Sequence, residues 1–261
     1  LYPGSLGGYL QRVTTHESRY SELGSIGRGA EGEVFEVEDR VDGSRYALKR
    51  SLIGPEDIES LEGVWGSALD SGHQNLLVPI ACRIPSANSA ELLLPLIKTV
   101  DGHSLVTQGG PEVAYSLLIQ VTKALAVLHG AGYCHRDLKP DNILIEETTR
   151  PGPWSGARAI LADLDLATPH SGHTNRAGVA SGTVGFMAPE VLSGAPASPQ
   201  SDLFSLGLWL FWLITGETPL HRTSLAESVR VARQFRELPP ISRLDGRFAG
   251  GGPPLARAWT G

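Results

Sequence analysis

The chain has 261 residues, of which 41% are hydrophobic and 19% charged, and its formal net charge is −6. This length and composition are typical of a folded globular protein with one large domain or two lobes. The net negative charge and the lack of a run of basic residues exclude nucleic acid as the main partner, because phosphate backbones require clustered Lys and Arg.

Cysteine content and apolar runs bear on the compartment. Cys82 and Cys134 are too few for a disulfide framework, which indicates a reducing, cytoplasmic setting, and Cys134 is interpreted as a packing residue in an apolar run. The longest apolar run, Leu203–Ile214, is shorter than the about 20 residues that cross a bilayer, so no membrane span is expected. Because the chain begins at Leu1 without a methionine, we expect it to be part of a longer protein.

Strand patterns dominate the part of the chain before residue 100. Residues 1–20 have little periodicity and are interpreted as a lead-in segment. Asp42-Gly43 is a strong hairpin signal between two strand-like runs. The predicted elements are strands over Glu33–Glu38, Ser44–Lys49, Leu76–Arg83 and Glu91–Ile97 and an amphipathic helix over Pro55–Leu69.

Helical patterns dominate the rest of the chain. Pro111 begins a long helical pattern that stops near Gly130, and Ser201–Thr215 is apolar nearly all round, so it should be buried. A strand-rich first part and a helical second part predict two lobes with a cleft between them. The predicted elements are helices over Pro111–Gly130, Ser201–Thr215 and Ser224–Phe235 and short strands over Ile143–Ile145 and Ala159–Ala162.

Residues His135–Asn142 read HRDLKPDN and form the most informative stretch of the chain. They place the carboxylate of Asp137, the amine of Lys139 and the amide of Asn142 in one loop. Such a set can hold a hydroxyl nucleophile, balance phosphate charge and ligate a metal. A polar loop with a turn at Lys139-Pro140 is the structural alternative. The order of the residues resembles the catalytic loop of eukaryotic-type protein kinases, H-R-D-x-x-x-x-N.

Residues 27–34 and Lys49, at the end of the predicted strand Ser44–Lys49, form a pattern typical of nucleotide binding. Residues 27–34 read G-x-G-x-x-G-x-V between strand-like runs, which argues against a dinucleotide-binding fingerprint, although ordinary hairpins also carry such glycines. The motif resembles the kinase glycine-rich loop, followed by a strand lysine that would hold the α- and β-phosphates of ATP. The resemblance assigns Gly27, Gly29, Gly32, Val34, Ala47 and Lys49 to the nucleotide site.

The helix after Lys49 carries glutamates that the resemblance implicates in holding the Lys49 ammonium. Glu62 is our first candidate and Glu59 the second, while a solvated helix face is the structural alternative. Gly63 and Gly66 each weaken this helix by up to about 1 kcal/mol relative to alanine. In the family, a bulky apolar residue usually stands where this chain has Gly66.

Asp163-Leu164-Asp165 follows a short apolar strand, in the place of the kinase D-F-G motif. By the resemblance, Asn142 and Asp163 hold the metal ions, which are Mg²⁺ with Mn²⁺ as the alternative. Asp165 replaces a glycine, which removes the freedom of glycine at positive φ and adds a negative charge near the metal. We expect reduced flipping of this segment, with a weakened or altered metal site as the alternative.

Later motifs follow in the order found in kinases. Ala188-Pro189-Glu190 resembles the end of an activation segment, and Asp202 resembles the aspartate that anchors the catalytic loop backbone. Lys139 and Thr183 resemble the serine/threonine-specific branch. Arg136 suggests regulation by a phosphate on the activation segment. The candidate acceptors are Thr168, Ser171, Thr174 and Ser181.

Together these motifs imply an α+β, bilobal protein-kinase-like fold, with a small antiparallel β-sheet N-lobe plus one helix and a mainly helical C-lobe. The resemblance fades after Glu217, so we expect the C-lobe to be incomplete or atypical. Adenine contacts are expected at Lys98, Thr99 and Val100, or at Pro95-Leu96 in the alternative register. The expected parts are the lead-in 1–20, the N-lobe 21–98, the hinge 99–103 and the C-lobe 104–261.

The resemblance implies a serine/threonine protein kinase whose partners are ATP, Mg²⁺ and a protein hydroxyl, with no particular oligomeric state predicted. Asp137 would accept the hydroxyl proton, and Lys139 would offset charge on the transferring γ-phosphoryl group. One alternative is a pseudokinase scaffold or nucleotide-binding switch, which Gly66 and Asp165 favour. Another is a small-molecule phosphotransferase, a class that generally lacks the Ala-Pro-Glu segment.

Overall fold

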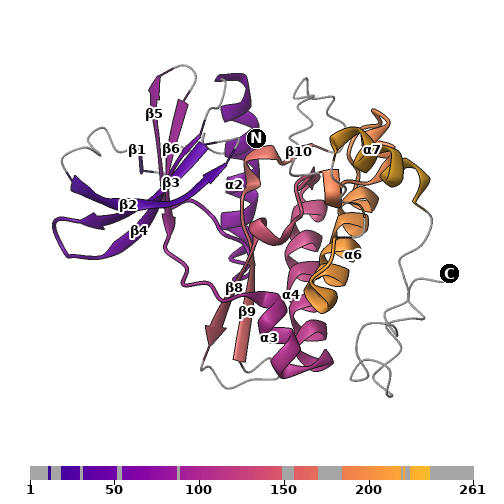
Figure 1. Cartoon of the computed structure of the whole chain (residues 1–261). Coiled ribbons are helices and arrows are strands. Elements are labelled where there is room, and N and C mark those ends of the chain that lie inside the picture. The colour runs from indigo at the N-terminus through magenta and orange to yellow at the C-terminus, as the bar shows by residue number, and fades with distance from the viewer. Residues whose placement is uncertain are drawn as a thin grey trace.

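The structure is a computed structural model that describes residues 11–12, 19–29, 32–51, 55–86, 89–148, 156–169, 184–218, 220 and 224–235. Its N-terminal part forms a β-sheet with one long helix, and the remainder is mostly helical (Figure 1). This architecture confirms the predicted α+β, bilobal fold.

The large sheet holds six of the described strands in the order β1-β5-β6-β4-β3-β2. Neighbouring strands are antiparallel, except that β1 and β5 are parallel. The predicted lead-in therefore contributes a strand, β1, and the first residue of β2. The bounds are β1 (Gln11–Arg12), β2 (Tyr20–Gly29), β3 (Gly32–Asp39), β4 (Arg45–Ser51), β5 (Ala81–Ser86) and β6 (Ser89–Pro95).

Alternation along β4 and β6 gives the sheet two different faces. Leu48 and Leu93 are cross-strand partners and pack in a small apolar cluster on one face. Ala47, Lys49 and Leu92 occupy the alternate positions, so they face the opposite side. The buried lysine thus lies on the face that borders the helical lobe.

Helices α2 and α6 are each two residues longer than predicted, α7 is one residue shorter at each end, and α3 and α5 were not predicted. Helix α3 follows the sheet directly and begins after Asp101, whose side chain accepts a hydrogen bond from Ser104 N at 2.8 Å. This N-cap is the signal that would have found it. The bounds are α2 (Pro55–Ser71), α3 (Gly102–Gly109), α4 (Pro111–Gly130), α5 (Pro189–Leu192), α6 (Pro199–Thr215) and α7 (Leu225–Gln234).

The largest hydrophobic cluster joins α2 to the second lobe, where α4 and α6 lie side by side (Figure 1). Trp65 of α2, Leu117 and Leu125 of α4 and Trp209 of α6 are all buried in it. By length and composition α4 is apolar enough to cross a membrane, yet its buried residues show that it is a core helix. The cluster also includes residues of β8 (Ile143–Thr148) and β9 (Gly156–Leu161).

The fold corrects one local prediction and bears out another. The strand predicted over Leu76–Arg83 is wrong in its first half, because β5 begins at Ala81 and Leu76 forms only a single bridge to Leu161. Helix α2 runs unbroken through Gly63 and Gly66, as the prediction of a helix over Pro55–Leu69 required. A Cβ at Gly63 would lie 2.4 Å from the Tyr133 hydroxyl oxygen, so glycine here permits close packing of α2 on the second lobe.

Candidate active site

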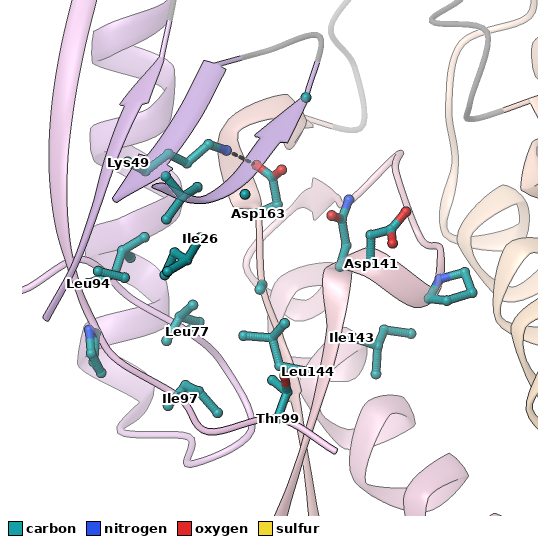
Figure 2. Close-up of a pocket in the computed structure, with 18 of the residues that line it drawn as sticks. Ile26, Lys49, Leu77, Leu94, Ile97, Thr99, Asp141, Ile143, Leu144 and Asp163 are labelled. Carbon is teal, nitrogen blue, oxygen red and sulfur yellow. Dashed lines mark hydrogen bonds and ion pairs between the residues drawn. The ribbon is translucent and has the colours of Figure 1, made fainter. Parts of the chain in front are cut away.

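A cavity of about 1090 Å³ opens between the sheet and the helical lobe. Figure 2 shows apolar side chains lining it from both sides, with Ile26 and Leu94 from the sheet and Leu144 from β8. An apolar cleft with a few converging polar groups is the usual form of a small-molecule site. The predicted site residues that line it are Gly27, Gly29, Gly32, Val34, Ala47, Lys49, Thr99, Val100, Lys139, Asn142 and Asp163.

The glycine motif lies where β2 and β3 meet at this cavity. Gly27 pairs with Val34 and Gly29 with Gly32, so the motif joins two strands, whereas a dinucleotide-binding fingerprint opens a helix. Gly32 has φ 151°, and a Cβ there would lie 1.9 Å from the carbonyl oxygen of Arg50. Only glycine fits this contact, which keeps the hairpin close against β4.

Asp202 of α6 fixes the backbone at the start of the catalytic loop, as predicted. One carboxylate oxygen accepts the N–H of His135 at 2.8 Å, and the other accepts the N–H of Arg136 at 2.9 Å. Nε2 of His129, in the last turn of α4, lies 2.8 Å from the first of these oxygens. These contacts hold Arg136 in the left-handed conformation, with φ 73°. The loop after β7 (Tyr133–Cys134) is therefore anchored to a buried helix.

The Asp137 side chain is buried and does not itself line the cavity, but it is held by two predicted site residues that do. Its Oδ2 accepts hydrogen bonds from Lys139 Nζ at 2.6 Å and from Asn142 Nδ2 at 2.7 Å. Its Oδ1 has no hydrogen-bond partner among the described residues. The carboxylate is thus fixed in place through one oxygen, while the other can accept a proton or a hydrogen bond.

Lys49 and Asp163 both line the cavity and contact each other (Figure 2). Lys49 Nζ lies 2.6 Å from Oδ1 of Asp163 and 2.8 Å from Oδ2 of Asp165. Burial by itself lowers the pKa of Lys49, but the charges of Asp165 and Asp163 outweigh it and raise this pKa. For Asp163 the two effects have the opposite signs: burial raises the pKa of its carboxyl, but the charge of Lys49 outweighs burial and lowers this pKa. Both groups are therefore charged at neutral pH.

The donor atoms suit a divalent metal that is shared with phosphate. Asn142 Nδ2 donates to Asp137, so the amide oxygen of Asn142 is the atom left to ligate a metal. Asn142 and Asp163 both line the cavity and offer hard oxygen donors, and Mg²⁺ typically takes one or two carboxylates together with substrate phosphates. No group of three or more His, Cys, Asp or Glu that could hold a metal occurs in the described part of the chain.

Comparison with known proteins matches residues 20–246 to the protein kinase domain. The chain belongs to the protein kinase family. Serine/threonine-protein kinase Pkn1 of Myxococcus xanthus is 32% identical over 231 residues, covering 84% of this chain and 32% of Pkn1. Serine/threonine-protein kinase PknK of Mycobacterium tuberculosis (strain ATCC 25618 / H37Rv) is 28% identical over 230 residues, covering 84% of this chain and 20% of PknK.

A third relative, serine/threonine-protein kinase PkaB of Streptomyces coelicolor (strain ATCC BAA-471 / A3(2) / M145), is 28% identical over 211 residues, covering 77% of this chain. The match covers 50% of PkaB, so the chain spans half or less of each of these curated relatives. Protein kinases as a family use ATP and a divalent metal.

The segment that leads from β6 to α3 forms one end of the kinase cleft. Lys98 is exposed and does not line the cavity, so its predicted adenine contact finds no support here. Pro95 and Leu96, the alternative register, line the cavity together with Ile97. Leu94, just before them, pairs with Ala47 across the sheet. Alternation on β6 is the signal that would have placed Leu92 and Leu94 on this face.

Some predictions on the helix and the activation segment lie outside the described residues. These are the side chains of Glu59 and Glu62, whose pairing with Lys49 stays a prediction, and residues Ser171, Thr174, Ser181 and Thr183. Thr168 is buried in β10 (Thr168–Pro169) opposite Cys134, which argues against it as a phosphate acceptor.

The helix that begins in the Ala188-Pro189-Glu190 motif is held by an arginine that the sequence did not reveal. Arg233 of α7 donates from Nη2 to the carbonyl oxygen of Leu192, the last residue of α5, at 2.9 Å. Helix α7 also packs on the cluster around Phe186 and Leu208. The end of the activation segment is therefore fastened to α7 through a backbone contact.

Proposed function

We propose that this chain is the catalytic domain of an ATP-dependent serine/threonine protein kinase that acts with Mg²⁺. The observation that supports this most strongly is the geometry of Asp137, whose Oδ2 is fixed by Lys139 and Asn142 while its Oδ1 lacks a described partner. The names of the relatives as serine/threonine kinases and the Lys139 position favour a serine or threonine hydroxyl as the acceptor.

Each residue has a distinct part in this mechanism. Oδ1 of Asp137 accepts the hydrogen bond of a substrate hydroxyl, aligns its oxygen with the γ-phosphoryl group and takes up its proton. Lys139, 2.6 Å from the same carboxylate, offsets negative charge on the transferring group. Asn142 and Asp163 would hold a metal ion, which would supply further charge neutralisation on the phosphates. Catalysis then consists mainly of positioning and electrostatic stabilisation.

The nucleotide end of the cleft follows from the sheet. The backbone at Gly27, Gly29 and Gly32 carries no side chain that would block approach to phosphate oxygens. Lys49 contributes a positive charge for the α- and β-phosphates. Val34 and Ala47 from the sheet, with Leu144 from β8, provide apolar walls suited to a planar base.

The test is transfer of radiolabelled phosphate from ATP-Mg²⁺ to casein or myelin basic protein, followed by phosphoamino-acid analysis. We expect label on serine or threonine, and a loss of about 10²- to 10⁴-fold in Asp137→Asn. Asp42→Asn in the β3–β4 turn is the matched control, because Asp42 is exposed and far from the cavity lining. Equal label with the native protein and Asp137→Asn would remove the catalytic role of Asp137. Nucleotide binding without any transfer would favour a pseudokinase.

A further inference from the structure

A buried polar contact joins strand β4 to the segment that contains Asp163 and Asp165. Asp165 Oδ2 accepts a hydrogen bond from the hydroxyl of Ser51 at 3.0 Å and lies 2.8 Å from Lys49 Nζ. Ser51 and Asp165 are both buried. One carboxylate oxygen of Asp165 is therefore braced by a hydroxyl and a cation from the same strand.

The contact is a consequence of local geometry on both sides. Lys49 and Ser51 are two residues apart in β4, so their side chains emerge on the same face of the sheet. On the other side, η3 (Leu164–Leu166) turns Leu164 into the main hydrophobic cluster beside α2. The left-handed conformation falls on Asp163, with φ 62°, and not on Asp165. The aspartate that replaces the family's glycine therefore occupies ordinary backbone and directs its carboxylate to β4.

The two aspartates that contact Lys49 differ in exposure and in their other roles. The side chain of Asp163 is 23% exposed, whereas that of Asp165 is 7% exposed. Asp163 is the predicted metal ligand, so its carboxylate is required by the metal when the nucleotide is bound. Asp165 is braced by Ser51, a contact that does not involve Asp163.

We propose that Asp165 is a positioning residue that holds the Lys49 ammonium in the nucleotide site, the role that the family resemblance assigns to a glutamate of α2. This inference rests on the proposed function of the cleft. It makes the placement of Lys49 depend on the segment around η3. On this proposal, the aspartate that stands in place of the family's glycine orients Lys49.

The contact itself is tested without nucleotide or metal, through thermal unfolding of Lys49→Met, Asp165→Asn and the double variant. Lys49→Met leaves two neighbouring carboxylates without their cation, and Asp165→Asn removes one of them. We therefore expect Lys49→Met to lower the unfolding midpoint much less in the Asp165→Asn background. The same cycle with Asp42→Asn is the control and should be additive. Additivity in the Asp165 cycle as well would overturn the proposal.

The positioning role is tested by kcat and KM for ATP. We expect Asp165→Asn to lower kcat/KM at least about tenfold, the size of one charge-assisted hydrogen bond, and by more than Glu62→Gln or Glu59→Gln. Ser51→Ala, which removes only the brace, should give a smaller loss in the same direction. A larger loss from either glutamate variant than from Asp165→Asn would overturn the proposal.

A metal titration separates this role from metal ligation. If Asp165 were a metal ligand, Asp165→Asn would raise the Mg²⁺ concentration needed for half-maximal transfer, while the unfolding cycle of Lys49 and Asp165 would stay additive. That pair of results would overturn the proposal. If the native protein transfers no phosphate, the proposed function fails, and the unfolding cycle still decides whether Lys49 and Asp165 interact.

Discussion

Replacing Gly63 with alanine tests how closely α2 packs on the second lobe. In a helix interior, alanine is favoured over glycine by about 1 kcal/mol. Here the added Cβ would lie 2.4 Å from the hydroxyl oxygen of Tyr133 and 3.5 Å from its ring carbon Cζ. Overpacking typically costs about 1–3 kcal/mol, and the middle of that range exceeds the gain in helix propensity by about 1 kcal/mol. We therefore expect Gly63→Ala to reduce the free energy of unfolding by about 1 kcal/mol.

Tyr133→Phe provides the decisive background, because it removes the hydroxyl and leaves Cζ at an ordinary contact distance. In that background Gly63→Ala should increase stability by about 1 kcal/mol. Thermal unfolding followed by circular dichroism resolves this reversal, since 1 kcal/mol corresponds to about 2–4 °C in a chain of this size. Gly130→Ala is a control, because a Cβ at Gly130 meets no atom within 4 Å. An equal loss from Gly63→Ala in both backgrounds would refute the contact with the Tyr133 hydroxyl.

Two further predictions concern the catalytic loop. Burial raises the pKa of Cys134 to about 12, so little of the thiol is ionised at pH 8. Because the thiolate is the reactive form, iodoacetamide should modify Cys134 only after the protein unfolds. Rapid labelling of Cys134 in the native protein, located by mass spectrometry, would contradict this. Asp202→Asn replaces an acceptor oxygen with an amide nitrogen and leaves the N–H of His135 or Arg136 without an acceptor, at a cost of about 1–3 kcal/mol. We expect a lower unfolding midpoint together with reduced phosphate transfer, and an Asp202→Asn variant unchanged in both would show that the anchor is dispensable.

Features that depend on residues close in sequence were predictable. The contact of Asp137 with Lys139 and Asn142 arises within one short loop, so the residue types alone suggested it. The Asp42-Gly43 turn between two strand patterns predicted the β3–β4 hairpin, and apolar patterns predicted α4 and α6. Helix α3 was missed because it is short and its signal is a single N-cap, Asp101.

The sequence by itself therefore determined the chemistry of the loop, the order of the elements and the family. Only the tertiary structure decided which groups meet across the cleft. Lys49 contacts Asp163 across 114 residues of sequence, and no periodicity specifies that pairing. The choice of Asp165 as a second partner follows from the packing of Leu164 beside α2, which turns the neighbouring aspartates towards β4. Gly63, which local propensity marks as a weakness, is favoured because Tyr133 of the other lobe occupies the space of its missing side chain.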